Sequence, residues 1–157
     1  MGLDMYLYAN NYLSKFDGEE SKILNKVLGI LPELEGYRNE GKYSTVGTVS
    51  LEITVGYWRK ANHIHRWFLN NCAEGEADTC QRIYVDRENL KELRDTCRRV
   101  LEFRHLAEDQ LPTQEGFFFG GTSYDEYYYS ENERTIKVIE QALELPKGYT
   151  FTYQASW

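Results

Sequence analysis

The chain has 157 residues, a formal net charge of −7 and a sequence pI near 5.0, with 41% hydrophobic and 27% charged residues. This length suits one domain with its own core, and the composition argues against intrinsic disorder. The acidic balance disfavours general affinity for nucleic acid or for anionic membranes. The three cysteines lack metal-ligand spacing. We therefore expect no metal site, and free thiols in a reducing, cytoplasmic compartment.

The first predicted element is a half-buried strand at the N-terminus. Leu3, Met5 and Leu7 alternate there with polar or aromatic residues, which is the pattern of a strand with one buried face. The opening residues lack a basic region and an apolar core, so we expect no signal peptide. No apolar run approaches the length that crosses a membrane.

Two helices and a strand are predicted in the next part of the chain. Residues 19–31 carry apolar side chains at helical spacing, and Pro32 ends that helix. Residues 37–42 are polar and contain glycine, which is typical of a loop. The Val, Thr and Ile content of residues 45–57 predicts a strand. Residues 58–72 then predict a helix whose apolar stripe begins at Trp58 and includes His65.

The remaining elements alternate in the same way. Residues 82–85 predict a short strand, and Asp86 is the expected cap of the helix that follows. Ser130 and Glu133 have the spacing of a capping box that opens a last helix, and residues 149–153 predict a last strand. The prediction is one α+β domain over residues 1–157, with about four helices packed on a small mixed β-sheet. The strands at the two ends of the chain are expected to pair in that sheet.

A basic segment covers residues 57–68, and no acidic residue occurs from Ile53 to Cys72. On the predicted helix, one face would carry Arg59, Asn62, His63 and Arg66. Guanidinium groups, an amide and an imidazole on one face suit a phosphate or a carboxylate. The alternative is a solvated basic face that pairs with acids elsewhere in the protein. The position of His65 on the apolar stripe favours a hydrogen-bonded packing residue over a general base, and His63 is expected to be more exposed.

An aromatic segment covers residues 117–129, where seven of thirteen side chains are aromatic. Gly120 and Gly121 in its middle allow close approach of the backbone to a neighbour. We interpret the segment as a recognition loop, and the alternative is that its rings line the core. The adjacent carboxylates of Asp125 and Glu126 would point apart in an extended segment, which is poor geometry for paired acid–base catalysis.

Several motifs taken together resemble a widespread family of small bacteriophage and prophage proteins. They are GLDMYL at residues 2–7, GYWRKAN at 56–62, His65 with Trp67 and Phe68, and GFFFG at 116–120 followed by Tyr124-Asp125-Glu126. The resemblance covers nearly the whole chain. It implies a phage context, in which small proteins are often accessory factors that act on host processes, including host defence. It implies no particular activity.

The favoured function is binding of a small anionic, nucleotide-like ligand in a host-cell cytoplasm, without a cofactor. The expected ligand-binding residues are Trp58, Arg59, Lys60, Asn62, His65, Arg66, Phe118, Thr122, Tyr124, Asp125 and Glu126. The alternative is inhibition of a host protein by direct contact through the acidic, tyrosine-rich surface. A third possibility is an enzyme on a phosphorylated substrate with His63 or His65 as acid or base. No nucleophile–base pair can be assembled from the sequence, so a non-enzymatic function is favoured. The oligomeric state stays open.

Overall fold

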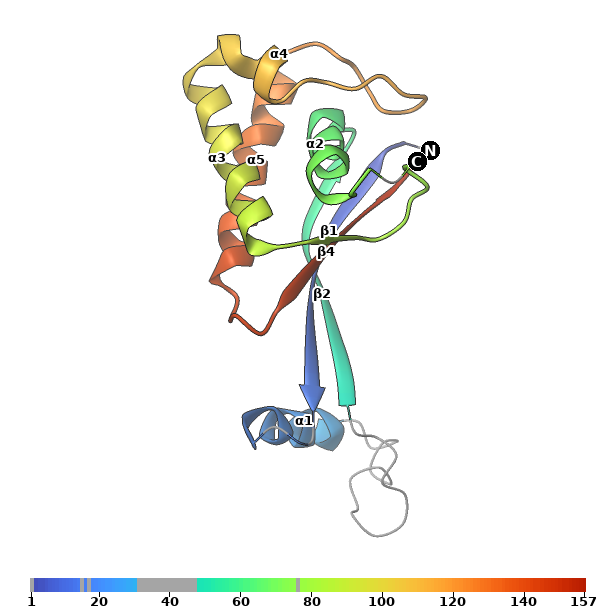
Figure 1. Ribbon diagram of the computed structural model, residues 1–157, viewed down its shortest axis with the longest axis vertical. Helices are drawn as coiled ribbons and strands as arrows, with labels where there is room; N and C mark the ends of the chain where they lie inside the picture. The colour runs from blue at the N-terminus through green and yellow to red at the C-terminus, as the bar shows by residue number, and fades with distance from the viewer. Residues whose placement is uncertain (1, 15, 17, 31–47, 76) are drawn as a thin grey trace. The chain divides into compact units, whose positions relative to one another are not determined.

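The computed structural model describes residues 2–14, 16, 18–30, 48–75 and 77–157 (Figure 1). The predicted helix stop at Pro32, the predicted loop at 37–42 and the first residues of the predicted strand at 45–57 lie outside these ranges. The chain divides into two compact units, Met1–Ala9 with Ile53–Trp157 and Asn10–Glu52. The described helices and strands form an α+β fold, as the sequence predicts.

Four described strands form one sheet in the order β2-β1-β4-β3. Their bounds are Asp4–Ser14 for β1, Thr48–Arg59 for β2, Ile83–Val85 for β3 and Thr150–Ser156 for β4. The strands from the two ends of the chain, β1 and β4, are neighbours, as expected, and Figure 1 shows the start of β1 beside the end of β4. The expectation of a mixed sheet is wrong, because neighbouring strands all run in opposite directions. β1 and β4 are neighbours in the sheet but not consecutive in the chain, so a crossover connects them.

One face of the sheet is buried under helices in the larger unit. Met5 and Leu7 of β1 are fully buried, which confirms the alternation predicted from the sequence. Helices α2 (Asn62–Cys72), α3 (Arg87–Glu102) and α5 (Glu126–Glu144) supply the other side of this core. Figure 1 shows α3 and α5 packed side by side. Most of the apolar burial that drives folding therefore lies between this sheet face and the helices.

The predicted start of the second helix is wrong. Strand β2 continues through Trp58 and Arg59, because Gly56 and Trp58 both face the core, where an added Cβ on Gly56 would meet Val138 of α5. Lys60 then takes a left-handed conformation with φ of 59°, and α2 begins only at Asn62. Arg59 is therefore on a strand, and the expected face shared by Arg59 and the helix residues does not exist.

The cap of α3 is confirmed and that of α5 is corrected. Asp86 accepts from the backbone N–H of Asn89, and the Asn89 side chain accepts from Asp86 in return, which is a capping box. Helix α5 begins one turn earlier than predicted, since Asp125, and not Ser130, is its N-cap. The tyrosines at 127–129 are consequently helical. A 3-10 turn at Arg104–Leu106 and the short helix α4 (Ala107–Gln110) connect α3 to the segment before α5.

The smaller unit has a core of its own. Helix α1 (Gly18–Ile30) matches the helix predicted over residues 19–31 within the described range. Leu24 and Leu28 on α1 pack with Leu13 of β1, and Val49 and Leu51 of β2 pack beside them. This local spacing of four residues between leucines is the pattern from which the helix was predicted.

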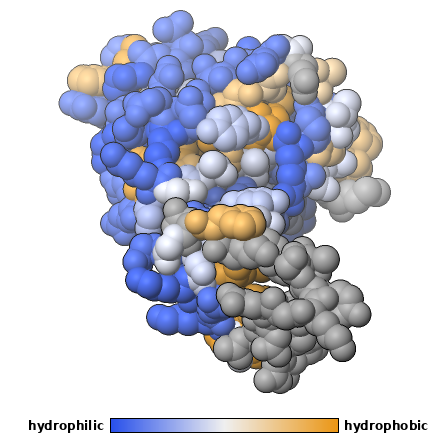
Figure 2. Space-filling model, turned by 60° about the horizontal axis from the view of Figure 1, so that its bottom comes forward, coloured by the Kyte–Doolittle hydropathy of each residue, from blue (hydrophilic) through white to orange (hydrophobic). Residues whose placement is uncertain are grey.

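The features that bear on a membrane-spanning helix are the length and apolar character of the described helices and the surface drawn in Figure 2. Among the described ranges, no helix has both the length and the apolar character needed to cross a bilayer. On the face drawn in Figure 2, hydrophilic residues dominate and hydrophobic side chains form separate patches.

Candidate functional site

The start of α2 and the aromatic segment lie against each other, and Asn62 joins them. Its amide nitrogen donates to the carbonyls of Phe119 (3.2 Å) and Gly121 (2.8 Å). Its amide oxygen accepts from the backbone N–H of Gln114 (3.0 Å). Asn62 is only 2% exposed, so these bonds satisfy a buried amide and fix the loop on the helix. The two motifs singled out in the sequence are therefore neighbours in space.

Three of the predicted ligand-binding residues lie at the end of β2 and directly after it. Trp58 is fully buried and donates from Nε1 to Oγ1 of Thr135 (2.9 Å). Arg59 is largely exposed, its Nε lies 3.9 Å from Oδ1 of Asp4, and its carbonyl accepts from the Tyr127 hydroxyl. Lys60 is exposed. The side chains of the basic segment therefore lie in different surroundings and do not form one continuous face.

The aromatic segment divides into an exposed tip and an inner part. Phe117 is 82% exposed and Phe118 is 40% exposed, and their ring centroids lie 4.2 Å apart. Phe118 has φ of 78°, which is uncommon for a bulky residue. Its carbonyl accepts from the N–H of Leu3, so the tip is attached to the start of β1. Phe119 and Tyr128, by contrast, are buried, so the alternative that rings line the core holds for part of the segment.

The remaining predicted residues of this segment make contacts within the protein. The Thr122 carbonyl accepts from Oγ1 of Thr113 (3.1 Å), and Tyr124 packs partly buried against the core. Asp125 caps α5 by accepting from the N–H of Tyr128, and Glu126 forms an ion pair with Arg104 at 3.4 Å. Each of these four has a contact that stabilises the fold or its surface.

A small pocket lies where α2, the aromatic segment and the start of α5 meet. Its volume is about 50 Å³. It is lined by Lys60, Asn62, His63, Thr113, Gly121, Ser123, Asp125, Tyr127 and Tyr128. Such a volume holds one or two waters or a small ion, and it is far below the roughly 300–1,000 Å³ of ligand pockets.

A larger pocket of about 340 Å³ lies between α2, α3 and α4. It is lined by His63, Arg66, Trp67, Asn70, Asn71, Glu92, Thr96, Arg99, Asp109, Gln110, Leu111 and Pro112. Arg66 is held there by a bond from Nη1 to the carbonyl of Thr113 (2.8 Å). Arg99 is held by bonds from Nε to Gln110 (3.0 Å) and from Nη2 to Thr96 (3.0 Å). Two positioned guanidinium groups and the side chains of Glu92 and Asp109 thus line one pocket.

His63 lines both pockets. The sequence pattern predicted an exposed side chain for His63, but the side chain is buried. It is 3% exposed, with its ring 4.2 Å from that of Tyr128 on α5. Its Nε2 lies 3.1 Å from Oδ1 of Asn132, an acceptor, so we assign the proton to Nε2 and an accepting lone pair to Nδ1. Burial lowers the pKa of His63 to about 3, although the bond to Asn132 acts in the opposite direction. His63 is therefore neutral at physiological pH.

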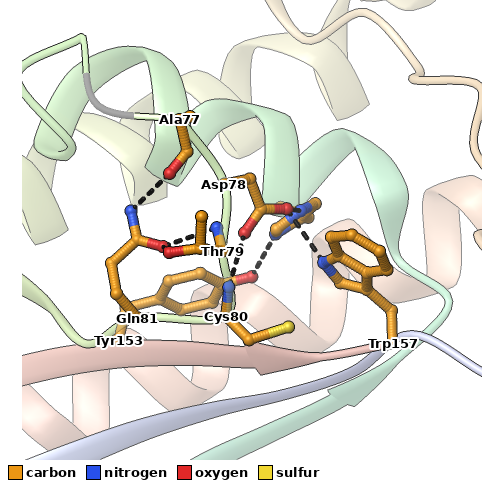
Figure 3. Close-up of polar contacts among 8 residues, drawn as sticks. Ala77, Asp78, Thr79, Cys80, Gln81, Tyr153 and Trp157 are labelled. Atoms are coloured by element: carbon orange, nitrogen blue, oxygen red, sulfur yellow. Dashed lines mark hydrogen bonds and ion pairs between the residues drawn. The ribbon is translucent and has the colours of Figure 1, made fainter.

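His65 is a buried, hydrogen-bonded packing residue, as predicted. Its Nε2 lies 2.9 Å from Oδ2 of Asp78, and its Nδ1 lies 2.7 Å from the hydroxyl of Tyr153. Asp78 also accepts from Nε1 of Trp157 and from the backbone N–H of Cys80 (Figure 3). Burial lowers the pKa of His65, whereas the charge of Asp78 and the hydrogen bond to it act in the opposite direction. A neutral His65 that donates to Asp78 and accepts from Tyr153 satisfies every partner.

Sequence reasoning missed the α3 side of the larger pocket. Glu92, Thr96 and Arg99 follow the end of α2 at Cys72 by 20 to 27 residues, and only the helical spacing of these three polar residues could have placed them on one face together. No protein-family model, curated protein or solved structure matches the chain.

Proposed function

We propose that this protein is a phage-encoded accessory protein that binds a small anionic, nucleotide-like ligand in the larger pocket, within the host-cell cytoplasm. The observation that carries the proposal is the pair of positioned guanidinium groups, Arg66 and Arg99, in a pocket of about 340 Å³. The phage context rests on the resemblance of the sequence motifs, and a function against host defence is an inference from that context.

The groups in the larger pocket suit the parts of a nucleotide. Arginine forks bind phosphate through paired charge-assisted hydrogen bonds. Glu92 and Asp109 offer acceptors for ribose hydroxyls, as acidic residues do in dinucleotide sites. The largely buried rings of Trp67 and of neutral His63 form an uncharged part of the pocket wall, which suits a base. The volume corresponds to the lower end of ligand pockets, so a mononucleotide suits it better than a dinucleotide.

We expect Arg99→Gln to weaken binding of mononucleotides by roughly tenfold to a hundredfold, because one charge-assisted contact contributes about 1.5–3 kcal/mol. Isothermal titration calorimetry with a panel of linear and cyclic mononucleotides measures this change. The matched control is Arg98→Gln, on the preceding residue of α3, because Arg98 pairs with Asp95 and Glu140 outside the pocket. The proposal is wrong if no nucleotide binds below about 100 μM, or if the two variants behave alike.

A second function, direct contact with a host protein, is favoured by the exposed tip of the aromatic segment. Phe117 and Phe118 project to solvent as a contacting pair, while Phe118 holds an uncommon backbone conformation. Tyr127, 49% exposed, is held by its bond to the Arg59 carbonyl. Aromatic side chains are enriched at the cores of protein interfaces, and tyrosine is among the residues that most often dominate binding energy there.

We expect Phe117→Ala to abolish recovery of a host partner in pull-down experiments from host lysate, without lowering stability, because Phe117 is 82% exposed. The control is Phe16→Ala, since Phe16 is 83% exposed and lies in the smaller unit. Equal recovery of the partner with Phe117→Ala and with the unmodified protein would exclude the tip as the interface.

A further inference from the structure

The face of the sheet opposite the helices carries a row of tyrosines. Along β1, Tyr6 and Tyr8 alternate with the buried Met5, Leu7 and Ala9, so both tyrosines point away from the helical layer. Further outward-facing aromatic residues are Tyr57 on β2, which alternates with Gly56 and Trp58, and Tyr84 on β3, which alternates with Ile83 and Val85. Three of the four described strands therefore contribute aromatic side chains to this face, which we call the tyrosine face.

The rings of the tyrosine face are arranged as a continuous series. The centroids of Tyr57 and Tyr6 lie 5.3 Å apart, and those of Tyr6 and Tyr8 lie 6.0 Å apart with an interplanar angle of 15°. Tyr57 is fixed by a hydrogen bond from its hydroxyl to Oδ1 of Asp4 (2.6 Å). The series thus crosses from an edge strand to a central strand of the sheet.

Arginine side chains lie along the series. The Arg82 guanidinium is 4.7 Å from the centroid of Tyr8, and its Nε donates to Gln154 of β4. The Arg134 guanidinium is 6.0 Å from the centroid of Tyr57, and Arg59 lies near Asp4 beside the same ring. Among the described residues, the acidic groups beside this face include Asp4, the largely buried Glu131, which is 3.9 Å from Arg134, and Glu74, which lines a pocket with Arg82 and Tyr84. Arg59 and Arg134 lie beside these acids, and Arg82 contacts Tyr8 and Gln154, so three guanidinium groups lie next to the rings.

We propose that the tyrosine face binds single-stranded nucleic acid by stacking bases on Tyr6, Tyr8 and Tyr57 and by holding phosphates with Arg59, Arg82 and Arg134. An antiparallel sheet with aromatic residues on its strands is a stacking platform for unpaired bases, and every base offers a flat face to it. Guanidinium groups beside the rings supply both phosphate contacts and stacking surfaces. This is a local surface for unpaired strands, distinct from general affinity for nucleic acid, and it is independent of the larger pocket.

The test is fluorescence anisotropy with labelled oligo-dT and oligo-U of about ten nucleotides, at several salt concentrations. Three phosphate contacts predict that log affinity falls with log salt with a slope of about −2. We expect Tyr6→Ala to weaken binding about tenfold or more, whereas Tyr6→Phe keeps the ring and stays close to the unmodified protein. Circular dichroism of each variant verifies that the sheet is retained.

The remaining variants separate this surface from the other proposals. Arg59→Gln should weaken binding and reduce the salt slope by about 0.7, and Arg99→Gln in the larger pocket should change neither. Absence of oligonucleotide binding below about 100 μM overturns the proposal. So does binding that Tyr6→Ala leaves unchanged while the fold is intact, and so does binding of a neutral oligosaccharide such as cellohexaose in place of the oligonucleotides.

Discussion

Trp58→Ala lowers the free energy of unfolding by about 3–5 kcal/mol, which is the expected result for truncation of a fully buried tryptophan. Trp58 has no exposed surface, contacts the ring of Phe68 edge-on, and donates to Thr135 at 2.9 Å. Its removal leaves a cavity between β2 and α5 and an unpaired hydroxyl acceptor. Urea unfolding at neutral pH measures the loss, and the thermal midpoint should fall by roughly 10 °C.

Two further variants test the assignment of Trp58 to the core. Trp58→Phe keeps an aromatic ring and loses the hydrogen bond to Thr135, so we expect a smaller loss of about 1–2 kcal/mol. Trp157→Ala removes a half-exposed indole and one bond to Asp78, with an expected loss of about 1 kcal/mol. A loss below about 1.5 kcal/mol for Trp58→Ala would contradict the buried position that the structure gives it.

The second large effect is acid destabilisation through His63. Burial lowers its pKa to about 3 in the folded state, whereas the unfolded chain titrates near 6.5. The unfolded state therefore binds more protons between these two values, and stability falls as pH is lowered through this window. Each pH unit below 6.5 costs about 1.4 kcal/mol, so we expect a loss of about 2–3 kcal/mol by about pH 4.5 from this residue.

The pH profile is best measured as a difference between variants. His63→Gln should lose this contribution, so its stability should fall less steeply between about pH 6.5 and pH 4.5 than that of the unmodified protein. His105→Gln is the matched control, because His105 is exposed on the 3-10 turn. If His63→Gln and the unmodified protein show parallel pH profiles, His63 is not held neutral by its surroundings.

The parts of the fold that local sequence determines were predicted well. Asp86 caps α3 because an acceptor directly before the helix satisfies its first N–H groups, and this depends only on neighbouring residues. The alternation around Met5 likewise identifies a strand with one buried face. The sequence predicted that the second helix begins at Trp58, whereas Trp58 lies in β2. Trp58 fits both an apolar stripe at helical spacing and the alternation of buried residues along β2, so the pattern did not separate the two. The left-handed Lys60 that separates β2 from α2 is not a glycine, so the sequence carries no sign of it.

The candidate site was predicted only in part, since tertiary contacts determine it. Asn62 donates to the carbonyls of Phe119 and Gly121 in the aromatic segment, whereas Arg66 donates to the carbonyl of Thr113, which precedes that segment. Arg99 reaches the same pocket from α3, and no local pattern relates a residue on one helix to a residue on another. Ser130 was taken as a cap because its spacing to Glu133 fits, whereas Asp125 satisfies the N–H of Tyr128 and starts the helix earlier.

The position of β4 between β1 and β3 has a consequence for the order of folding. This strand lies in the middle of the sheet, yet it is the last of the four described strands to leave the ribosome. The hydrogen bonds that β1 makes on that side must wait until Thr150–Ser156 has been synthesised. Contacts between segments so distant in the sequence form late, because closing the loop between them costs conformational entropy before the contacts can stabilise it. Helices α3 and α5 can associate earlier, so a nascent chain would expose half of its sheet core until β4 arrives.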